Sequence, residues 1–145
     1  KAGDDLRQDV GVLQCFGAMN HALTTRGART NFGEAIFIGT YGVCAFSPSV
    51  GCIELVRGVR ALTAVSESDT FSKAQLERLV ASAAGGYVAA HVLGVRDRHS
   101  DNILISDDGT LFHIDFGHVL DDSVFLDTDT FATTPGLRSA MGPRA

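Results

Sequence analysis

Two segments of the chain carry apolar residues at helical spacing. Between Asp4 and about Leu23, apolar side chains recur every three or four positions, and acidic residues open the run, which suits the positive end of a helix. Between Lys73 and Val92, leucine, valine and tyrosine form a second stripe with small residues on its flank. The pattern therefore predicts two helices, of which the second is long and well buried.

Short runs rich in β-branched and aromatic residues predict strands. Residues 34–46 and 50–58 are two such runs, separated by Ser-Pro-Ser, and they predict two or three strands joined by turns. Further along, NILIS (102–106) and TLFHID (110–115) flank Asp-Asp-Gly, which predicts a β-hairpin. Helices and strands mixed in this way predict an α/β (α+β) fold.

Composition narrows the class of protein. The 145 residues suit one domain or part of one, and the net charge of −5 argues against a broad nucleic-acid surface. Cys15, Cys44 and Cys52 lie in apolar runs, so we expect reduced, buried thiols in an intracellular protein. There is no signal pattern and no apolar run of about 18 residues, so any membrane contact is expected to be peripheral. The abrupt start at Lys1 leads us to expect a piece of a longer protein.

Aspartate, histidine and asparagine gather between Leu93 and His118. In phosphoryl transfer a site must position ATP, hold magnesium between phosphate oxygens and orient the acceptor hydroxyl. Protein kinases do so with a loop aspartate, an asparagine five residues later and the aspartate of an Asp-Phe-Gly motif. Asp97, Asn102 and Asp115 repeat that spacing, although the loop reads Asp-Arg-His where protein kinases read His-Arg-Asp. We therefore expect Asn102 and Asp115 to bind Mg²⁺ through oxygen atoms.

Three stretches, in this order, resemble the phosphatidylinositol 3- and 4-kinase family, to which related protein kinases also belong: KAGDDLRQD (1–9), DRHSDN (97–102) and LFHIDFGH (111–118). TYGVCAF, GCIELV and AAGGYVAAHVLG agree with the segments between them. The resemblance implies a protein-kinase-like bilobal fold, incomplete at both ends. Residues 1 to about 56 would form a small lobe and hinge, and residues 57–145 the start of a large lobe with the catalytic and activation loops.

The resemblance also implies a set of ATP contacts. Lys1 matches the lysine that contacts the phosphates. Asp9 and Tyr41 match residues that line the inner pocket. Glu54 and Val56 match hinge residues whose backbone groups would meet the adenine. Leu104 and Ile114 match apolar residues that would lie beneath it.

Asp97 and His99 are the candidate catalytic pair. A histidine with an unperturbed pKa of about 6.5 can accept or relay the proton of the acceptor hydroxyl near neutral pH. Asp97 would orient that hydroxyl or the histidine, and which of the two is the base stays open. Two neighbours are interpreted as structural: His113 as a core residue, and Arg98 as the partner of a nearby carboxylate.

The expected function is that of an ATP-dependent lipid kinase acting on the inositol ring of phosphatidylinositol. FHIDFGH and GYVAAHVLG favour a 3-kinase, whereas Arg96 is basic as in 4-kinases. The alternatives are a 4-kinase, a related serine/threonine protein kinase and an inactive truncated piece. We expect a cytoplasmic protein with peripheral membrane association and a possible regulatory subunit, and we expect the 145 residues alone to be inactive.

The segment that follows the Asp-Phe-Gly motif bears on the substrate. Residues 118–135 contain no lysine or arginine, and they carry four aspartates, at 121, 122, 127 and 129. A bisphosphorylated headgroup would meet negative charge there. Placing like charges side by side at an interface costs on the order of several kcal/mol of binding free energy. The segment therefore predicts that plain phosphatidylinositol is preferred to its bisphosphate.

Overall fold

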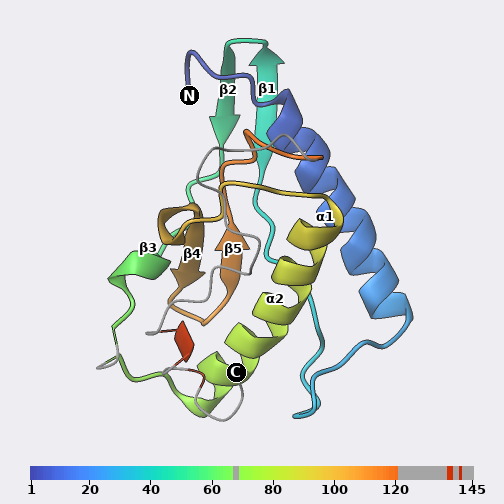
Figure 1. Cartoon of the computed structure of the whole chain (residues 1–145), viewed down its shortest axis with the longest axis vertical. Coiled ribbons are helices and arrows are strands. Elements are labelled where there is room, and N and C mark those ends of the chain that lie inside the picture. Colours follow the sequence, from blue (N-terminus) through green and yellow to red (C-terminus); the bar gives the residue numbers. More distant parts are fainter. Residues whose placement is uncertain (67–68, 121–136, 139–140, 142–145) are drawn as a thin grey trace.

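Helix α2 (Lys73–Val92) is the central element of the computed structural model, which describes residues 1–66, 69–120, 137, 138 and 141 (Figure 1). Its bounds agree with the predicted segment. A capping box opens it, because the Ser72 hydroxyl accepts from the Gln75 backbone N–H while the Gln75 side chain accepts from that of Ser72. None of the helices in these ranges is long and apolar enough to cross a membrane.

Two small antiparallel sheets lie beside the helices. Strands β1 (Val43–Ser47) and β2 (Val50–Ile53) form a two-stranded hairpin. Strands β3 (Val59–Ala61), β4 (Ile103–Ser106) and β5 (Leu111–His113) form a three-stranded sheet in that order. The β4–β5 hairpin confirms its prediction, and the mixed α/β content agrees with the expected class. Single turns of 3₁₀ helix occupy Leu62–Ala64 and Ser100–Asn102.

One face of the three-stranded sheet packs against α2. The core there includes Ile103, Ile105 and Leu111, all with at most 1% of their surface exposed. The Leu111 backbone N–H donates to the Ser82 hydroxyl of α2 at 2.9 Å, so the helix also satisfies a strand amide. Gly86 of α2 faces His113, where a Cβ atom would lie 3.2 Å from the imidazole Cδ2. This close approach is what buries the strand that leads to the Asp-Phe-Gly motif.

Helix α1 (Arg7–Thr25) supplies a second core. Val12 and Phe16 contact Ala89 and Ala90 of α2 and Phe116 of the Asp-Phe-Gly motif within one buried cluster. The helix begins three residues later than the predicted start, because the Asp5 carboxylate accepts from the backbone N–H of Arg7 in a turn that precedes the helix.

The predicted strand at 34–46 is formed only over β1. Residues ahead of it are extended but are held by isolated contacts rather than by a continuous ladder. The side chain of Asn20 on α1 accepts from the Ile38 N–H at 2.7 Å and donates to the Ile38 carbonyl at 2.9 Å. A side chain thus takes the place of a strand partner at this position. Strand β3 was not predicted, since three residues carry too little alternation to detect.

The prediction of buried thiols was wrong. All three cysteines are exposed. Cys15 lies on the solvent side of α1, away from Val12 and Phe16. Cys44 and Cys52 point to the open face of the β1–β2 hairpin, because the period of two places their neighbours on the other face, toward α1. An apolar run in a two-stranded hairpin therefore does not imply burial on both faces.

His113 is a core residue, as interpreted, with 1% of its surface exposed. Its ring packs edge-on against Tyr87 with centroids 5.3 Å apart. Neither ring nitrogen has a hydrogen-bond partner in the described structure. Burial lowers the pKa of His113 to about 3, so the ring is neutral. The four aspartates between 121 and 129 lie outside the described residues, as does the rest of that segment after Leu120.

Candidate active site

The predicted catalytic loop, residues 97–102, and the Asp-Phe-Gly motif lie side by side at one end of the β4–β5 hairpin. The Arg96 N–H donates to the His118 carbonyl at 2.9 Å, and the Ile114 N–H to the Asn102 carbonyl at 3.0 Å. Asp97 and Asp115 both have left-handed backbone conformations, with φ of 57° and 58°. Such non-glycine residues cost about 1–3 kcal/mol each and cluster at functional sites. Two of the predicted site residues thus carry the backbone strain typical of active sites.

Arg98 holds these two segments together. Its guanidinium donates to the carbonyl oxygens of Ile114 at 2.7 Å, of Asn102 at 3.4 Å and of Asp115. Its Nε donates to the Arg96 carbonyl at 2.7 Å, and only 9% of the residue is exposed. We expected a carboxylate partner, whereas these contacts are to backbone carbonyls. The planar, multidentate guanidinium fixes the spacing between the two candidate metal ligands, a role that the sequence pattern did not indicate.

The side chains of the predicted catalytic loop converge on Asn102. Its Nδ2 donates to the Asp97 carbonyl at 3.0 Å and lies 3.1 Å from His99 Nε2 and 3.4 Å from an Asp97 carboxylate oxygen. His99 Nε2 is also 3.8 Å from that carboxylate. The other ring nitrogen, Nδ1, accepts from the Asp101 N–H at 3.3 Å. The structure therefore brings Asp97, His99 and Asn102 into one cluster, with the imidazole half-exposed.

The donor set fits magnesium. Because Asn102 Nδ2 faces Asp97 and His99, its amide oxygen is left without a donor among the described residues. Asp115 is exposed, and one carboxylate oxygen accepts only a long 3.4 Å contact from the Gly117 N–H. The described part of the chain holds no group of three or more histidine, cysteine or acidic side chains that suits a metal. Two oxygen ligands are what Mg²⁺ uses when substrate phosphates and water complete its shell.

Three of the predicted small-lobe residues have pKa values to which Asp115 contributes. The Lys1 ammonium forms a 2.7 Å ion pair with Asp4, which raises its pKa, and Asp115 and Asp9 raise it further. Burial raises the pKa of Asp9, the Phe116 backbone N–H lowers it, and Asp115 raises it. Burial likewise raises the pKa of Tyr41, with Asp9 and Asp115 adding to the effect. These couplings place Lys1, Asp9 and Tyr41 within electrostatic reach of Asp115.

Gln8 contacts the Asp-Phe-Gly motif. The sequence pattern did not predict this contact, although Gln8 lies inside the stretch KAGDDLRQD. Its Nε2 donates to the carbonyl oxygens of Phe116 at 2.6 Å and of Gly117 at 2.9 Å. The Phe116 ring is fully buried, and its edge packs on Phe16 with centroids 5.6 Å apart. Helix α1 thus anchors the Asp-Phe-Gly motif through both a polar and an aromatic contact.

The predicted hinge groups bond to each other. The Val56 N–H donates to the Glu54 carbonyl at 3.2 Å, and the Glu54 N–H continues the β1–β2 ladder to the Gly42 carbonyl at 2.7 Å. The Glu54 carboxylate returns to the Gly42 N–H at 2.7 Å. The Val56 N–H is therefore occupied within the chain, whereas the Glu54 carbonyl keeps a second lone pair.

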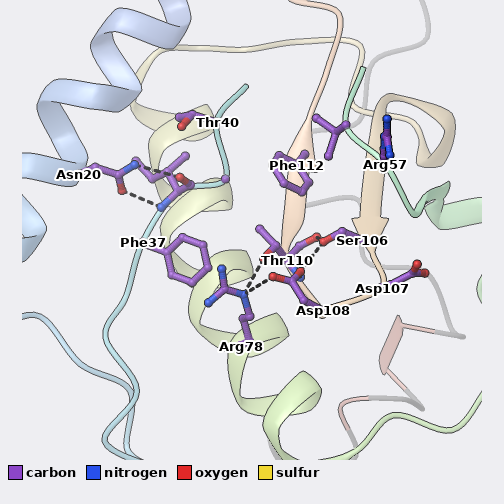
Figure 2. A pocket seen from close by; sticks show the side chains of 13 residues that line it. Asn20, Phe37, Thr40, Arg57, Arg78, Ser106, Asp107, Asp108, Thr110 and Phe112 are labelled. Carbon is purple, nitrogen blue, oxygen red and sulfur yellow. Dashed lines mark hydrogen bonds and ion pairs between the residues drawn. The ribbon is translucent and has the colours of Figure 1, made fainter. Parts of the chain in front are cut away.

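Leu104 and Ile114 lie on the sheet face opposite α2, both half-buried, with Phe112 paired across the ladder from Leu104. Phe112 also lines a cavity of about 560 Å³ beside the hinge (Figure 2). Of the predicted cofactor residues, this cavity includes Val56. At its lower rim the Arg78 Nε donates to Thr110 at 2.7 Å and pairs with Asp108 at 2.9 Å. Leu104 and Ile114 are not among the residues that line this cavity, although Phe112 lies on the same sheet face as both.

Comparisons with known proteins agree with the motifs. Residues 60–143 match the family described as phosphatidylinositol 3- and 4-kinase. Phosphatidylinositol 3-kinase 1 of Dictyostelium discoideum is 31% identical over 144 residues, which cover 83% of this chain and 9% of that relative. Phosphatidylinositol 3-kinase VPS34 of Saccharomyces cerevisiae is 34% identical over 137 residues, which cover 83% of this chain and 15% of that relative. The chain spans less than a sixth of the length of these relatives. It belongs to the phosphatidylinositol 3- and 4-kinase family.

Proposed function

We propose that this chain carries the catalytic and Asp-Phe-Gly segments of an ATP-dependent phosphotransferase that acts on the inositol ring of phosphatidylinositol. The observation that carries the proposal is the Asp97, His99 and Asn102 cluster, held beside Asp115 by the guanidinium of Arg98. The relatives named as phosphatidylinositol 3-kinases favour a 3-kinase over a 4-kinase.

The proposed division of labour follows from the donor atoms. Asn102 and Asp115 would hold magnesium, which supplies charge neutralisation between phosphate oxygens when it is bound. The half-exposed imidazole of His99 would take the proton of the acceptor hydroxyl, and Asp97, whose carboxylate lies 3.8 Å from Nε2, would orient the ring and stabilise the imidazolium that forms. Lys1 would meet the phosphates, as the family resemblance implies, and its ammonium is held at present by the 2.7 Å ion pair with Asp4.

The placement of the nucleotide is also proposed. ATP would lie between residues 1–56, as small lobe and hinge, and residues 57–145, as the start of a large lobe. Adenine would meet the hinge at Glu54 and Val56, above Leu104 and Ile114. Asp9 and Tyr41 would form the inner wall. The protein would work in the cytoplasm at the surface of a membrane that contains phosphatidylinositol, where a regulatory subunit could join it.

The test is a transfer assay with the full protein, γ-labelled ATP, magnesium and vesicles that contain phosphatidylinositol, with a serine-rich peptide as the competing acceptor. We expect label in the lipid and loss of that label in the His99→Ala variant. Label on the peptide and none in the lipid would identify a related protein kinase instead. Label in neither acceptor would contradict the proposal.

The sequence of residues 118–135 bears on the choice of substrate. We propose that phosphatidylinositol is preferred to its bisphosphate, because this segment brings four aspartates and no lysine or arginine. Vesicles matched for surface charge separate this effect from membrane attraction. Equal or faster turnover of the bisphosphate would contradict it.

A further inference from the structure

Two of the three cysteines lie directly opposite each other in the β1–β2 hairpin. Cys44 of β1 and Cys52 of β2 are Cα partners in the antiparallel register, and both are free and exposed. Directly opposed residues of such a pair point to the same face of the hairpin. The two thiols are therefore neighbours on one open surface.

The ladder fixes how far apart the two backbones lie. The Glu54 N–H donates to the Gly42 carbonyl at 2.7 Å, which makes that opposed pair a hydrogen-bonded one. Two residues further along each strand, Cys44 and Cys52 occupy the same kind of position. Consistently, the N–H of Gly51 points to the other edge of β2, where it donates to the Lys1 carbonyl at 3.1 Å. A hydrogen-bonded pair has its Cα atoms about 5.5 Å apart, within the range of about 4.4–6.8 Å that disulfides span.

The opposite face of the hairpin is covered, which leaves the thiol face open. Gly51 is buried, and a Cβ atom there would lie 2.8 Å from the Leu6 Cδ1 at the start of α1. Phe46, two residues after Cys44 on β1, has 68% of its surface exposed. A small oxidant in solution can reach both sulfur atoms.

We propose that Cys44 and Cys52 form a site of reversible oxidative modification, which takes a peroxide as its oxidant and yields an intrahairpin disulfide. One thiolate attacks the peroxide, its sulfur becomes a sulfenic acid and hydroxide leaves. The second thiolate then attacks that sulfur, the S–S bond forms and a second hydroxide leaves. Both hydroxides take up the two protons that the thiols released, so two thiols and one hydrogen peroxide become one disulfide and two waters.

The geometry makes this disulfide easy to form and easy to reduce. Opposed Cβ atoms lie about 4.5–5.5 Å apart, and a disulfide needs about 3.5–4.5 Å. The hairpin has only two strands and an irregular register between Ala45 and Ser47, so it can bend to close this gap. The strain that remains raises the reduction potential, which is the property of labile rather than structural disulfides.

The cross-link would lie next to the candidate active site. The hairpin enters from Tyr41 and leaves through Glu54, so a bond between its strands would fix the spacing of the two segments. The oxidation chemistry itself does not depend on the proposed kinase function. A negative result in the oxidation test would therefore contradict this proposal alone and leave the proposed kinase function unaffected.

The test uses the intact reduced chain, dilute hydrogen peroxide, alkylation of the remaining thiols and tryptic mass analysis. No lysine or arginine lies between Thr30 and Arg57, so both cysteines fall in one peptide, while Cys15 falls in another and serves as an internal control. We expect peptide 30–57 to lose both alkyl groups and the mass of two hydrogen atoms, and to recover both thiols in dithiothreitol. The Cys15 peptide should stay alkylated.

A parallel reaction in denaturing urea separates the ladder from mere closeness in sequence. We expect the disulfide to form at least several-fold faster in the folded chain, and we expect Cys52→Ser to abolish it without changing the alkylation of Cys15. An equal or slower rate in the folded chain would overturn the proposal. So would disulfides that join different chains, or oxidation of Cys15 ahead of the pair.

Discussion

His113 should make the stability of the chain depend on pH between neutrality and pH 5. The ring is buried between Tyr87 and Gly86, and burial lowers its pKa from 6.5 to about 3. Between these two pKa values, His113 binds a proton in the unfolded chain but stays neutral in the folded chain. Stability is fully present above pH 6.5 and is lost as the pH falls toward 3.

The size of the loss at pH 5.0 follows from the unfolded state. Each pH unit below 6.5 costs 1.36 kcal/mol while the folded ring stays neutral, so the loss at pH 5.0 is about 2 kcal/mol. This figure requires only that the pKa in the folded state lie well below 5. With a urea slope of about 1–3 kcal/mol/M for a small protein, the midpoint should fall by roughly 1 M.

The assay is urea unfolding at pH 7.5 and pH 5.0 for the parent chain and His113→Leu, a variant of similar volume that cannot titrate. We expect the parent to lose about 2 kcal/mol more than the variant between the two pH values. The comparison with the variant matters because Asp9, whose pKa is raised by burial, acts in the opposite sense. His21→Gln removes an exposed imidazole of α1 and should keep the parent's behaviour. Equal pH dependence in the parent and His113→Leu would refute the reasoning.

Four further substitutions test the packing and the site. Gly85→Ala should destabilise the chain by about 1–3 kcal/mol, because the added Cβ would overlap the Phe37 carbonyl. Gly11→Ala has open space on α1 and should stabilise the chain by up to about 1 kcal/mol. Urea unfolding measures both changes, and changes of the same sign would refute the contact. Arg98→Lys should cost at least about 2 kcal/mol in the same assay, since one ammonium cannot replace the fork that bonds several carbonyls, and a neutral result would show that the clamp is dispensable. His99→Ala should lower kcat by about 10²–10⁴-fold in the lipid assay and leave the ATP dissociation constant unchanged, whereas a loss confined to ATP binding would assign His99 to the nucleotide.

The elements predicted best from the sequence are those with a long periodic pattern of apolar residues, or with two strand patterns on either side of a turn sequence. Helix α2 carries twenty residues of one period behind a serine cap, and the β4–β5 hairpin is marked by two alternating runs around Asp-Asp-Gly. Strand β3 has neither signal, because its three residues become a strand only by pairing with β4. Residues 34–42 looked like a strand from composition, but the Asn20 side chain satisfies the Ile38 backbone instead.

The candidate site was predictable as a set of residues but not as a set of contacts. Spacing selected Asp97, Asn102 and Asp115, since the motif preserves the distances along the chain. It could not show that Arg98 bonds backbone carbonyls, because those acceptors lie up to seventeen residues away and become neighbours only when the two loops meet. The prediction of buried cysteines was wrong for a similar reason. Which face of a hairpin is buried depends on the element that packs against it, and the sequence of the hairpin does not show that element.

The magnesium dependence of ATP binding tests the central claim most directly. The dissociation constant of a fluorescent ATP analogue would be measured with the chain in magnesium and in a chelator, for the parent and for Asp115→Asn, with Asp107→Asn as a control for an exposed aspartate of the β4–β5 turn. We expect magnesium to tighten binding to the parent and to the control by at least about tenfold, or 1.4 kcal/mol. Asp115→Asn should lose that gain. Binding that ignores magnesium, or a gain that survives Asp115→Asn, would contradict the assignment of Asn102 and Asp115 as the metal ligands.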